Sequence, residues 1–338
     1  MEQILITGAN GFLGNNLVRH FTAQGYKVRA MMRRAAVQAP GAVENLKSDC
    51  ACEFFYGNID NRDDLEKAVA GCDWVVHAAA MTDQWSTDPR VYEQINVKAT
   101  ILLAEVCVKA RVKKMVYVST ANVFGPGTPD EPGTELNGFT LFKAESYYIN
   151  TKYLAQQYLL QMAESGKLPV VLVNPCFMIG PHDYKPSSGT LLLHAFRKRV
   201  LFYPPGGKNF VFVGDVCKGI HSALEKGRVG QCYLLTGENL SYLEFFKRVK
   251  ACGTDRCIYI RLPRTVLKFI AWIAPWGQKL FGRAWKFTRP IVYLSTVHAY
   301  YSGEKAEREL DYTPRPIGQV VQETVDWFQT TELLRAGA

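Results

Sequence analysis

The first fourteen residues constrain the fold more than any other part of the chain. The apolar run Ile4-Leu5-Ile6 is typical of a buried strand, and it leads directly into Thr7-Gly8-Ala9-Asn10-Gly11-Phe12-Leu13-Gly14 and a helix-like stretch. Gly8 permits a tight turn, Gly11 lets the backbone approach a pyrophosphate, and Gly14 lets helix and strand pack closely. The free N–H groups and positive end of such a helix hold phosphate. The sequence therefore predicts a dinucleotide-binding site.

Strand and helix patterns alternate over the first half of the chain. We expect strands over 4–7, 27–32, 54–57, 73–79, 114–119 and 169–174, and helices over 15–24, 63–70, 88–110 and 145–165. Continuous apolar strands separated by helices indicate a parallel sheet that is covered on both faces. From about Asn174 the alternation fails, and loops rich in Gly and Pro separate shorter elements.

We therefore predict an α/β protein with two parts. A Rossmann-type doubly wound parallel sheet occupies 1–174, and a smaller C-terminal substrate-binding lobe occupies 175–338. We expect this lobe to be interleaved with the last strands of the sheet. The chain has 338 residues, 48% of them hydrophobic, which is enough for a sizeable core.

Nothing in the sequence predicts export, a membrane span or a metal site. There is no run of about twenty apolar residues, and Met1-Glu2 provides neither a basic start nor a cleavable apolar segment before the first strand. The nine cysteines lack any paired CxxC spacing, and Cys50-Ala51-Cys52 is too isolated to suggest zinc. We expect reduced cysteines and a cytoplasmic protein.

A tyrosine and a lysine four residues apart stand near the start of the helix over 145–165. Residues at this spacing share a helix face, so Tyr148 and Lys152 can approach one site. A neighbouring ammonium favours the phenolate and lowers the pKa of a tyrosine, which suits acid–base chemistry. The alternative is a solvated helix face. The same stripe continues through apolar residues, namely Ala155, Leu159 and Met162, which favours an inward-facing, catalytic pair.

The strand over 114–119 runs into two hydroxyl side chains, Ser119 and Thr120. Ligands of open α/β sheets bind beyond the carboxyl ends of the strands, so a substrate-binding hydroxyl is expected here. The alternative is that both residues only make local hydrogen bonds.

Taken together, these motifs resemble the extended short-chain dehydrogenases/reductases. The resemblance covers nearly the whole chain and is nearest to the dihydroflavonol-reductase, 3β-hydroxysteroid-dehydrogenase and sugar-epimerase-like branch of the NAD-dependent epimerase/dehydratase family. Besides the glycine loop, it rests on His77-Ala78-Ala79-Ala80, Asn96-Val97, Val116 to Thr120 with Val123-Phe124-Gly125, Tyr148-xxx-Lys152, Asn174-Pro175…Gly180-Pro181, and the stretch from Lys305 to Pro316.

The resemblance implies a role for each matching residue. Tyr148 would be the general acid/base, and Lys152 would lower its pKa and hold the nicotinamide ribose. The family's serine falls on Thr120, with Ser119 in reserve, and its hydroxyl would bind the reacting oxygen. The implied cofactor contacts are Gly8, Asn10, Gly11, Phe12, Leu13, Gly14, Arg33, Arg34, Asn58, Ile59, Ala78, Ala79, Ala80, Asn96, Tyr148, Lys152, Pro175, Phe177 and Met178.

Three positions depart from the family pattern. Gly57-Asn58-Ile59 has Asn where the family often has an adenine-binding Asp. Ala121-Asn122 lacks the Asp-Glu pair of the nucleotide-sugar 4,6-dehydratases, so we do not expect that activity. Asn174 stands in place of a common Arg.

The end of the second strand bears on the choice of cofactor. An acid there favours NAD, whereas a cation accommodates the 2′-phosphate of NADP. This chain has Arg33 and Arg34 and no acid until Glu44. The two arginines could simply be solvated, but we favour NADP, with NAD as the alternative.

Most of the positive charge lies in one C-terminal segment. The formal net charge of the chain is +9, and 245–303 contains eleven Lys or Arg against one acid. Within it, 264–287 combines cations with tryptophans. We expect a substrate lid there, and contact with an anionic membrane surface is the alternative. Nucleic acid is not expected, because no recognised binding module accompanies the charge.

Three functions remain open at this point. The first is hydride transfer between NADP(H) and a ketone or secondary alcohol on a fairly apolar small-molecule substrate, cyclic ones included. The second is an NAD-dependent nucleotide-sugar epimerase, and the third is a non-catalytic NADP-binding sensor. A homodimer is expected from the family, through the helices over 88–110 and 145–165. Tyr153, Gln156, Gln157 and Leu160 would offer its outer face.

Overall fold

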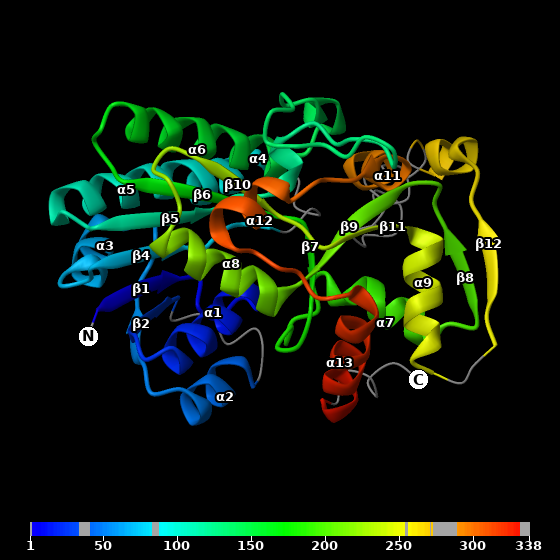
Figure 1. Ribbon diagram of the computed structural model, residues 1–338, viewed down its shortest axis with the longest axis horizontal. Helices are drawn as coiled ribbons and strands as arrows, with labels where there is room; N and C mark the ends of the chain where they lie inside the picture. The colour runs from blue at the N-terminus through cyan, green and yellow to red at the C-terminus, as the bar shows by residue number, and fades with distance from the viewer. Residues whose placement is uncertain are drawn as a thin grey trace.

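The structure is a computed structural model that describes residues 2–33, 41–82, 88–253, 256–270, 272 and 289–331. At its centre lies a seven-stranded sheet in the order β10-β6-β5-β4-β1-β2-β3 (Figure 1). Every neighbouring pair in it is parallel. The strands are β1 (Gln3–Thr7), β2 (Lys27–Met32), β3 (Glu53–Tyr56), β4 (Trp74–His77), β5 (Lys114–Val118), β6 (Val170–Pro175) and β10 (Cys232–Leu235).

Helices cover both faces of this sheet (Figure 1). Side chains alternate along β1: Ile4 and Ile6 enter one apolar layer, whereas Leu5 enters the other. The first layer lies under α1 (Phe12–Ala23) and α8 (Val213–Glu225), and the second under α3 (Arg62–Val69), α5 (Ala99–Ala110) and α6 (Tyr147–Glu164). The predicted doubly wound Rossmann-type fold is confirmed.

The helix predicted over 88–110 contains an irregular turn. It consists of α4 (Pro89–Tyr92), a π-helical turn η1 (Glu93–Lys98) and then α5. Such a turn widens the helix locally, and it occurs mostly where a side chain has a special task. Asn96, which lies in η1, is buried and bonds to a neighbouring loop, so the widening has a specific partner.

One helix of the first half was not predicted. This is α2 (Ala42–Asp49), which follows Gly41 in a left-handed conformation with φ +89°. The Glu44 carboxylate accepts the Gly41 N–H at 3.1 Å, and the Asn15 amide of α1 donates to the Ala42 carbonyl at 3.0 Å. These contacts stabilise the helix, and the short, weakly apolar sequence of α2 does not predict them.

The lobe contains two small sheets and several helices. The larger sheet has the order β11-β9-β13, with β7 also paired to β9, and the smaller joins β12 to β8. These strands are β7 (Phe177–Ile179), β8 (Val200–Tyr203), β9 (Gly207–Phe212), β11 (Glu238–Ser241), β12 (Ile258–Arg261) and β13 (His298–Ala299). The helices are α7 (Gly189–Arg197), α9 (Tyr242–Ala251), α11 (Arg289–Thr296), α12 (Glu304–Leu310) and α13 (Ile317–Thr330). Outside the lobe, two short 3₁₀ turns lie between β5 and α6, namely η2 (Ala121–Val123) and η3 (Leu141–Ala144).

The second part of the chain returns to the central sheet. After β7 and β9 have formed in the lobe, α8 packs on α1, and β10 pairs with β6 as an edge strand. Apolar residues of the lobe, such as Phe210 and Phe245, belong to the same core cluster as Ile4. The exact boundary at 174 and 175 stays a prediction.

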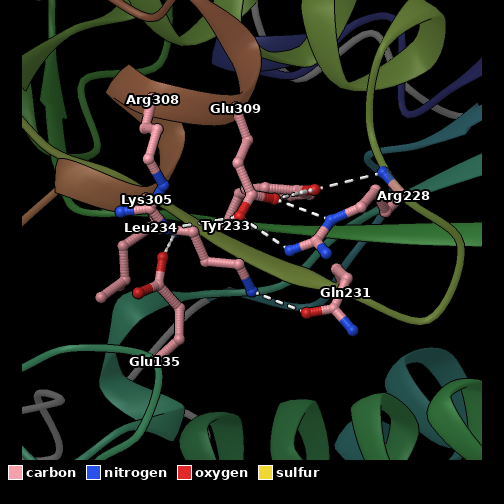
Figure 2. Close-up of polar contacts among 8 residues, drawn as sticks. All are labelled: Glu135, Arg228, Gln231, Tyr233, Leu234, Lys305, Arg308 and Glu309. Carbon is pink, nitrogen blue, oxygen red and sulfur yellow. Dashed lines mark hydrogen bonds and ion pairs between the residues drawn. The ribbon is translucent and has the colours of Figure 1, made fainter.

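A polar network fastens the edge strand β10 (Figure 2). The Leu234 N–H, at the free edge of the sheet, donates to the Glu135 carboxylate at 2.7 Å. On the same strand, the Tyr233 hydroxyl donates to Glu309 of α12 at 2.9 Å, and Arg228 donates to the same carboxylate. An unpaired edge is open to foreign strands, and here the loop carrying Glu135 covers it.

No helix in the described part of the chain has the length and apolar character needed to cross a bilayer. All nine cysteines are free thiols.

Candidate cofactor and catalytic site

The glycine loop has no room for side chains. Gly8, at the end of β1, has φ +72°, and a Cβ there would lie 2.8 Å from the Cα of Ala79. A Cβ on Gly14 would lie 2.0 Å from the Gly8 carbonyl oxygen. Gly11 caps α1 without a side chain, so the first N–H groups of the helix face outward from the strand ends. This geometry leaves room for a phosphate at the start of α1, and the contacts of the three glycines with a cofactor stay a prediction.

A buried hydrogen-bond chain joins the ends of β1 and β4 beneath the loop. The Thr7 hydroxyl lies 2.7 Å from Nδ1 of His77 and accepts the Ala79 N–H at 3.2 Å. On the other side of the ring, Nε2 lies 3.0 Å from the Thr100 hydroxyl. Burial, and secondarily the charge of Lys152, lower the pKa of His77 to about 3, so the ring is neutral. The predicted contacts at 78–80 are therefore held beside Gly8.

Asn96 supports the same segment from behind. Its side-chain oxygen accepts the Met81 N–H at 2.7 Å, and its amide donates to the Met81 carbonyl at 3.1 Å and to the Thr151 hydroxyl at 3.0 Å. The side chain is thus committed to protein partners. The structure shows it positioning the segment after β4, and its predicted contact with the cofactor stays a prediction.

Tyr148 and Thr120 meet at the carboxyl end of β5. The α6 helix starts at Tyr147, with the Ser146 hydroxyl accepting the Ile149 N–H at 3.4 Å, which places Tyr148 in the first turn. Burial raises the pKa of Tyr148 to about 12, and a side-chain hydrogen bond with Thr120 acts in the opposite direction. The Ser119 hydroxyl is buried and has no hydrogen-bond partner among the described residues. Thr120 is accordingly the better partner for Tyr148.

Lys152 lies on the inward face of α6, as predicted, and is 2% exposed. Its ammonium donates to the Val118 carbonyl at 2.6 Å and lies 4.0 Å from the centre of the Tyr117 ring. Burial lowers the pKa of Lys152 to about 7. The expectation that Lys152 lowers the pKa of Tyr148 is not met in this structure, because burial dominates the pKa of both groups.

Asn174 links the three elements that carry these residues. Its amide donates to the Thr120 carbonyl at 3.0 Å and to the Gln156 side chain at 2.9 Å. The residue that replaces the family's Arg is therefore an uncharged, fully buried link between β6, α6 and the turn that follows β5. Gln156 is buried with it, so the expectation that Gln156 lies on an outer face is wrong.

The predicted adenosine contacts are only partly defined. Arg33 is exposed just after β2, and Arg34 lies outside the described residues. The Asn58 N–H donates to the Asp64 carboxylate at 2.8 Å, and Ile59 packs in the core. The preference for NADP therefore stays a prediction.

Pro175 to Met178 cross from the central sheet into the lobe. Pro175 ends β6 and Phe177 begins β7, so the segment lies at the carboxyl edge of the sheet. Sequence reasoning missed Lys208 on β9, whose ammonium lies 5.2 Å from the centre of the Phe177 ring. Burial lowers the pKa of Lys208 to about 8. A single charged residue at the start of a strand that ends in Phe210-Val211-Phe212 was the available signal.

Comparison with known proteins places this geometry in a family. Residues 4–235 match the model of the NAD dependent epimerase/dehydratase family. The match spans more than half of the chain, and the chain belongs to this family. It is an NAD(P)-dependent enzyme of the extended short-chain dehydrogenase/reductase type, which confirms the predicted class and the use of a nicotinamide cofactor.

Individual relatives are similar over almost their full length. A putative dihydroflavonol 4-reductase of Synechocystis sp. is 30% identical over 333 residues, covering 96% of this chain and 94% of the relative. A decarboxylating sterol-4-alpha-carboxylate 3-dehydrogenase of Dictyostelium discoideum is 25% identical over 326 residues, covering 93% and 96%. The crystal structure of gox2253 superposes with a TM-score of 0.83 at 28% identity, covering 98% and 99% of the two chains.

Proposed function

We propose that the protein is an oxidoreductase that transfers hydride between NADP(H) and a ketone or secondary alcohol on a fairly apolar substrate. The observation that carries the proposal is the Tyr148–Thr120 pair at the end of β5, with the buried Lys152 one helical turn behind it. The residues that follow Thr120 are Ala and Asn, which cannot supply the carboxylates of a dehydratase. Relatives named as reductases and dehydrogenases support the same reaction class.

The residues of the site have separable tasks in a reduction. The bound cofactor supplies the hydride. With a pKa of about 12, Tyr148 is protonated at neutral pH and can donate its proton to the substrate oxygen as charge develops there. The Thr120 hydroxyl can donate a second hydrogen bond to that oxygen. The Lys152 ammonium is held at the base of the site by the Val118 carbonyl, where it can stabilise negative charge.

The residues fit a dinucleotide. Gly8, Gly11 and Gly14 leave the N-terminus of α1 open for a pyrophosphate, and Ala79 lies against Gly8 beside it. Arg33 follows β2, at the edge where the adenosine ribose is expected. We infer that Arg33 faces a 2′-phosphate.

Substitution of Arg33 tests the cofactor preference. Arg33→Ser removes one charge-assisted contact, and we expect the KM for NADPH to rise about tenfold while the KM for NADH stays constant. Lys27→Ser, an exposed cation at the opposite end of β2, is the matched control. An equal rise for both cofactors would mean that Arg33 does not read the phosphate.

The epimerase alternative is kept open by Lys208. A half-buried cation beside Phe177 can pair with a nucleotide diphosphate, although a carboxylate on an apolar skeleton would satisfy it equally. One relative is named for a substrate of the second kind, a carboxylate on a sterol: the decarboxylating sterol-4-alpha-carboxylate 3-dehydrogenase. Both possibilities require that the lobe side of the site faces an anionic group.

Net turnover separates the two reactions. The purified protein is mixed with NADPH and a panel of ring ketones, and in parallel with UDP-sugars, while NADPH absorbance is recorded. The proposal predicts consumption of NADPH by at least one ketone and a protein that is purified without bound nucleotide. Tightly retained NAD, with interconversion of UDP-sugars and no net turnover, would overturn it.

A further inference from the structure

The small sheet of the lobe exposes an apolar face. β8 and β12 pair in register, so that Val200 lies beside Ile258 and Phe202 beside Ile260. Partners in register project from the same face of a sheet. All four side chains are exposed, from 40% for Ile260 to 63% for Ile258, whereas Leu201 between them points into the core. Figure 1 shows this sheet at the right-hand end of the molecule, away from the central sheet.

The apolar surface extends onto the residues after β12. Residues 264–270 are helical, and Val266, Phe269 and Trp272 are exposed, the last two by 60% and 61%. The rings of Phe269 and Trp272 lie 6.1 Å apart. Single exposed apolar side chains are ordinary, but a contiguous group marks an interaction surface.

Basic residues accompany this surface within the two segments that form it. The segments 198–203 and 256–272 contain no Asp or Glu. Their exposed basic residues are Lys198, Arg199, Arg256, Arg261, Arg264 and Lys268. We call these cations, with the apolar side chains above, the basic–apolar surface.

We propose that the basic–apolar surface docks the protein on an anionic lipid bilayer. Apolar side chains can enter the boundary between headgroups and acyl chains while the flanking cations meet lipid phosphates and carboxylates. A second copy fits less well, because a two-fold interface through this surface would bring like charges together. The sequence alone points to 264–287, of which 271 and 273–287 lie outside the described residues. The structure adds the exposed strands β8 and β12 to this surface.

Vesicle flotation with the full-length protein tests the proposal independently of catalysis. Vesicles are made of phosphatidylcholine alone or of phosphatidylcholine and phosphatidylserine in equal parts. The expected result is binding to the anionic vesicles that weakens at high salt, and little binding to phosphatidylcholine. A lack of vesicle binding would contradict only the docking proposal and not the proposed hydride transfer. A lack of NADPH turnover would contradict only the proposed hydride transfer and not the docking proposal.

Matched variants identify the residues that bind. Phe202→Ser should weaken binding about tenfold, the loss expected for one large apolar side chain. Val229→Ser, which is exposed to a similar degree in the turn before β10, should leave binding unchanged. Arg261→Glu with Lys268→Glu should abolish binding to anionic vesicles, whereas Lys27→Glu with Lys167→Glu, which has the same net charge, should retain it.

Two outcomes would overturn the proposal. An equal loss of vesicle binding in Arg261→Glu with Lys268→Glu and in Lys27→Glu with Lys167→Glu would show that only net charge attracts the protein to vesicles. Unchanged vesicle binding of Phe202→Ser, with conversion of a dimer into a monomer on gel filtration, would show that a second copy covers this surface.

Discussion

The central sheet buries polar side chains, whereas the lobe exposes apolar ones. In and around the central sheet, several polar side chains are buried and hydrogen-bonded: His77 lies between two threonines, and Asn96 binds both polar groups of the Met81 backbone. In the lobe, apolar groups such as Phe202 and Ile258 are left exposed. The first arrangement fixes backbone positions beside the glycine loop, where the dinucleotide is expected. The second leaves surface for contacts that differ from one protein to another.

The largest effect is expected from a change in the glycine loop. A side chain at position 14 would collide with the Gly8 carbonyl oxygen, so Gly14→Val should weaken NADPH binding by more than about a hundredfold. Gly318→Ala, where a Cβ meets open space, is the control. Calorimetric titration with NADPH measures the loss. Because the variant could also unfold, Gly11→Ala, whose Cβ would lie 3.2 Å from the same oxygen, should give an intermediate loss in a folded protein. Full affinity in both variants would contradict the described loop.

The next effect concerns stability rather than binding. The pKa of Lys152 falls from about 10.4 in an unfolded chain to about 7 in the folded protein. Between these values the unfolded chain binds a proton that the folded protein lacks, so the free energy of unfolding rises with pH across this window. Lys152→Met should raise the free energy of unfolding at neutral pH by on the order of a few kcal/mol and flatten this slope, while activity is lost.

Urea unfolding at several pH values measures that change. Lys167→Met, which removes an exposed lysine, should keep the slope of the original protein. A destabilised Lys152→Met variant would mean that the hydrogen bond to Val118 outweighs the cost of burying the charge.

A smaller and more selective effect is expected in the lobe. Lys208→Met should lower the affinity for NADPH less than the affinity for the substrate, because the residue lies in the lobe beside Phe177 and away from the glycine loop that holds the pyrophosphate. It should raise the KM of a substrate that carries an anionic group by about tenfold. For the original protein, that KM should itself rise above pH 8, as Lys208 loses its proton. A loss of NADPH affinity as large as the rise in the substrate KM would show that Lys208 does not act on the substrate alone.

The sequence predicts the central sheet well because its signals are local. Each strand is a short apolar run, and the turn after β1 needs glycine for reasons visible in a few adjacent residues. The inward position of Lys152 also follows from helical spacing. The roles of Asn96 and Asn174 could not be predicted, since their partners Met81 and Thr120 are set by how helices and strands pack.

The electrostatics of the site were harder to predict than its geometry. Spacing indicates that Tyr148 and Lys152 share a face, but only the structure shows how deeply both are buried, and burial decides the direction of both pKa shifts. In the lobe, the pairing of β8 with β12 joins residues almost sixty positions apart. No periodicity within either segment reports that contact.

The account rests on proton donation by Tyr148, and one measurement tests it most directly. Protein saturated with NADPH is mixed rapidly with a ring ketone that the original protein reduces, and NADPH oxidation is followed. The measurement is made on Tyr148→Phe and on Tyr158→Phe, a variant on the same helix. We predict that Tyr148→Phe slows hydride transfer by about a hundredfold to ten-thousandfold even when the protein is saturated with NADPH, while Tyr158→Phe keeps the original rate. Hydride transfer at the original rate in Tyr148→Phe would contradict the assignment.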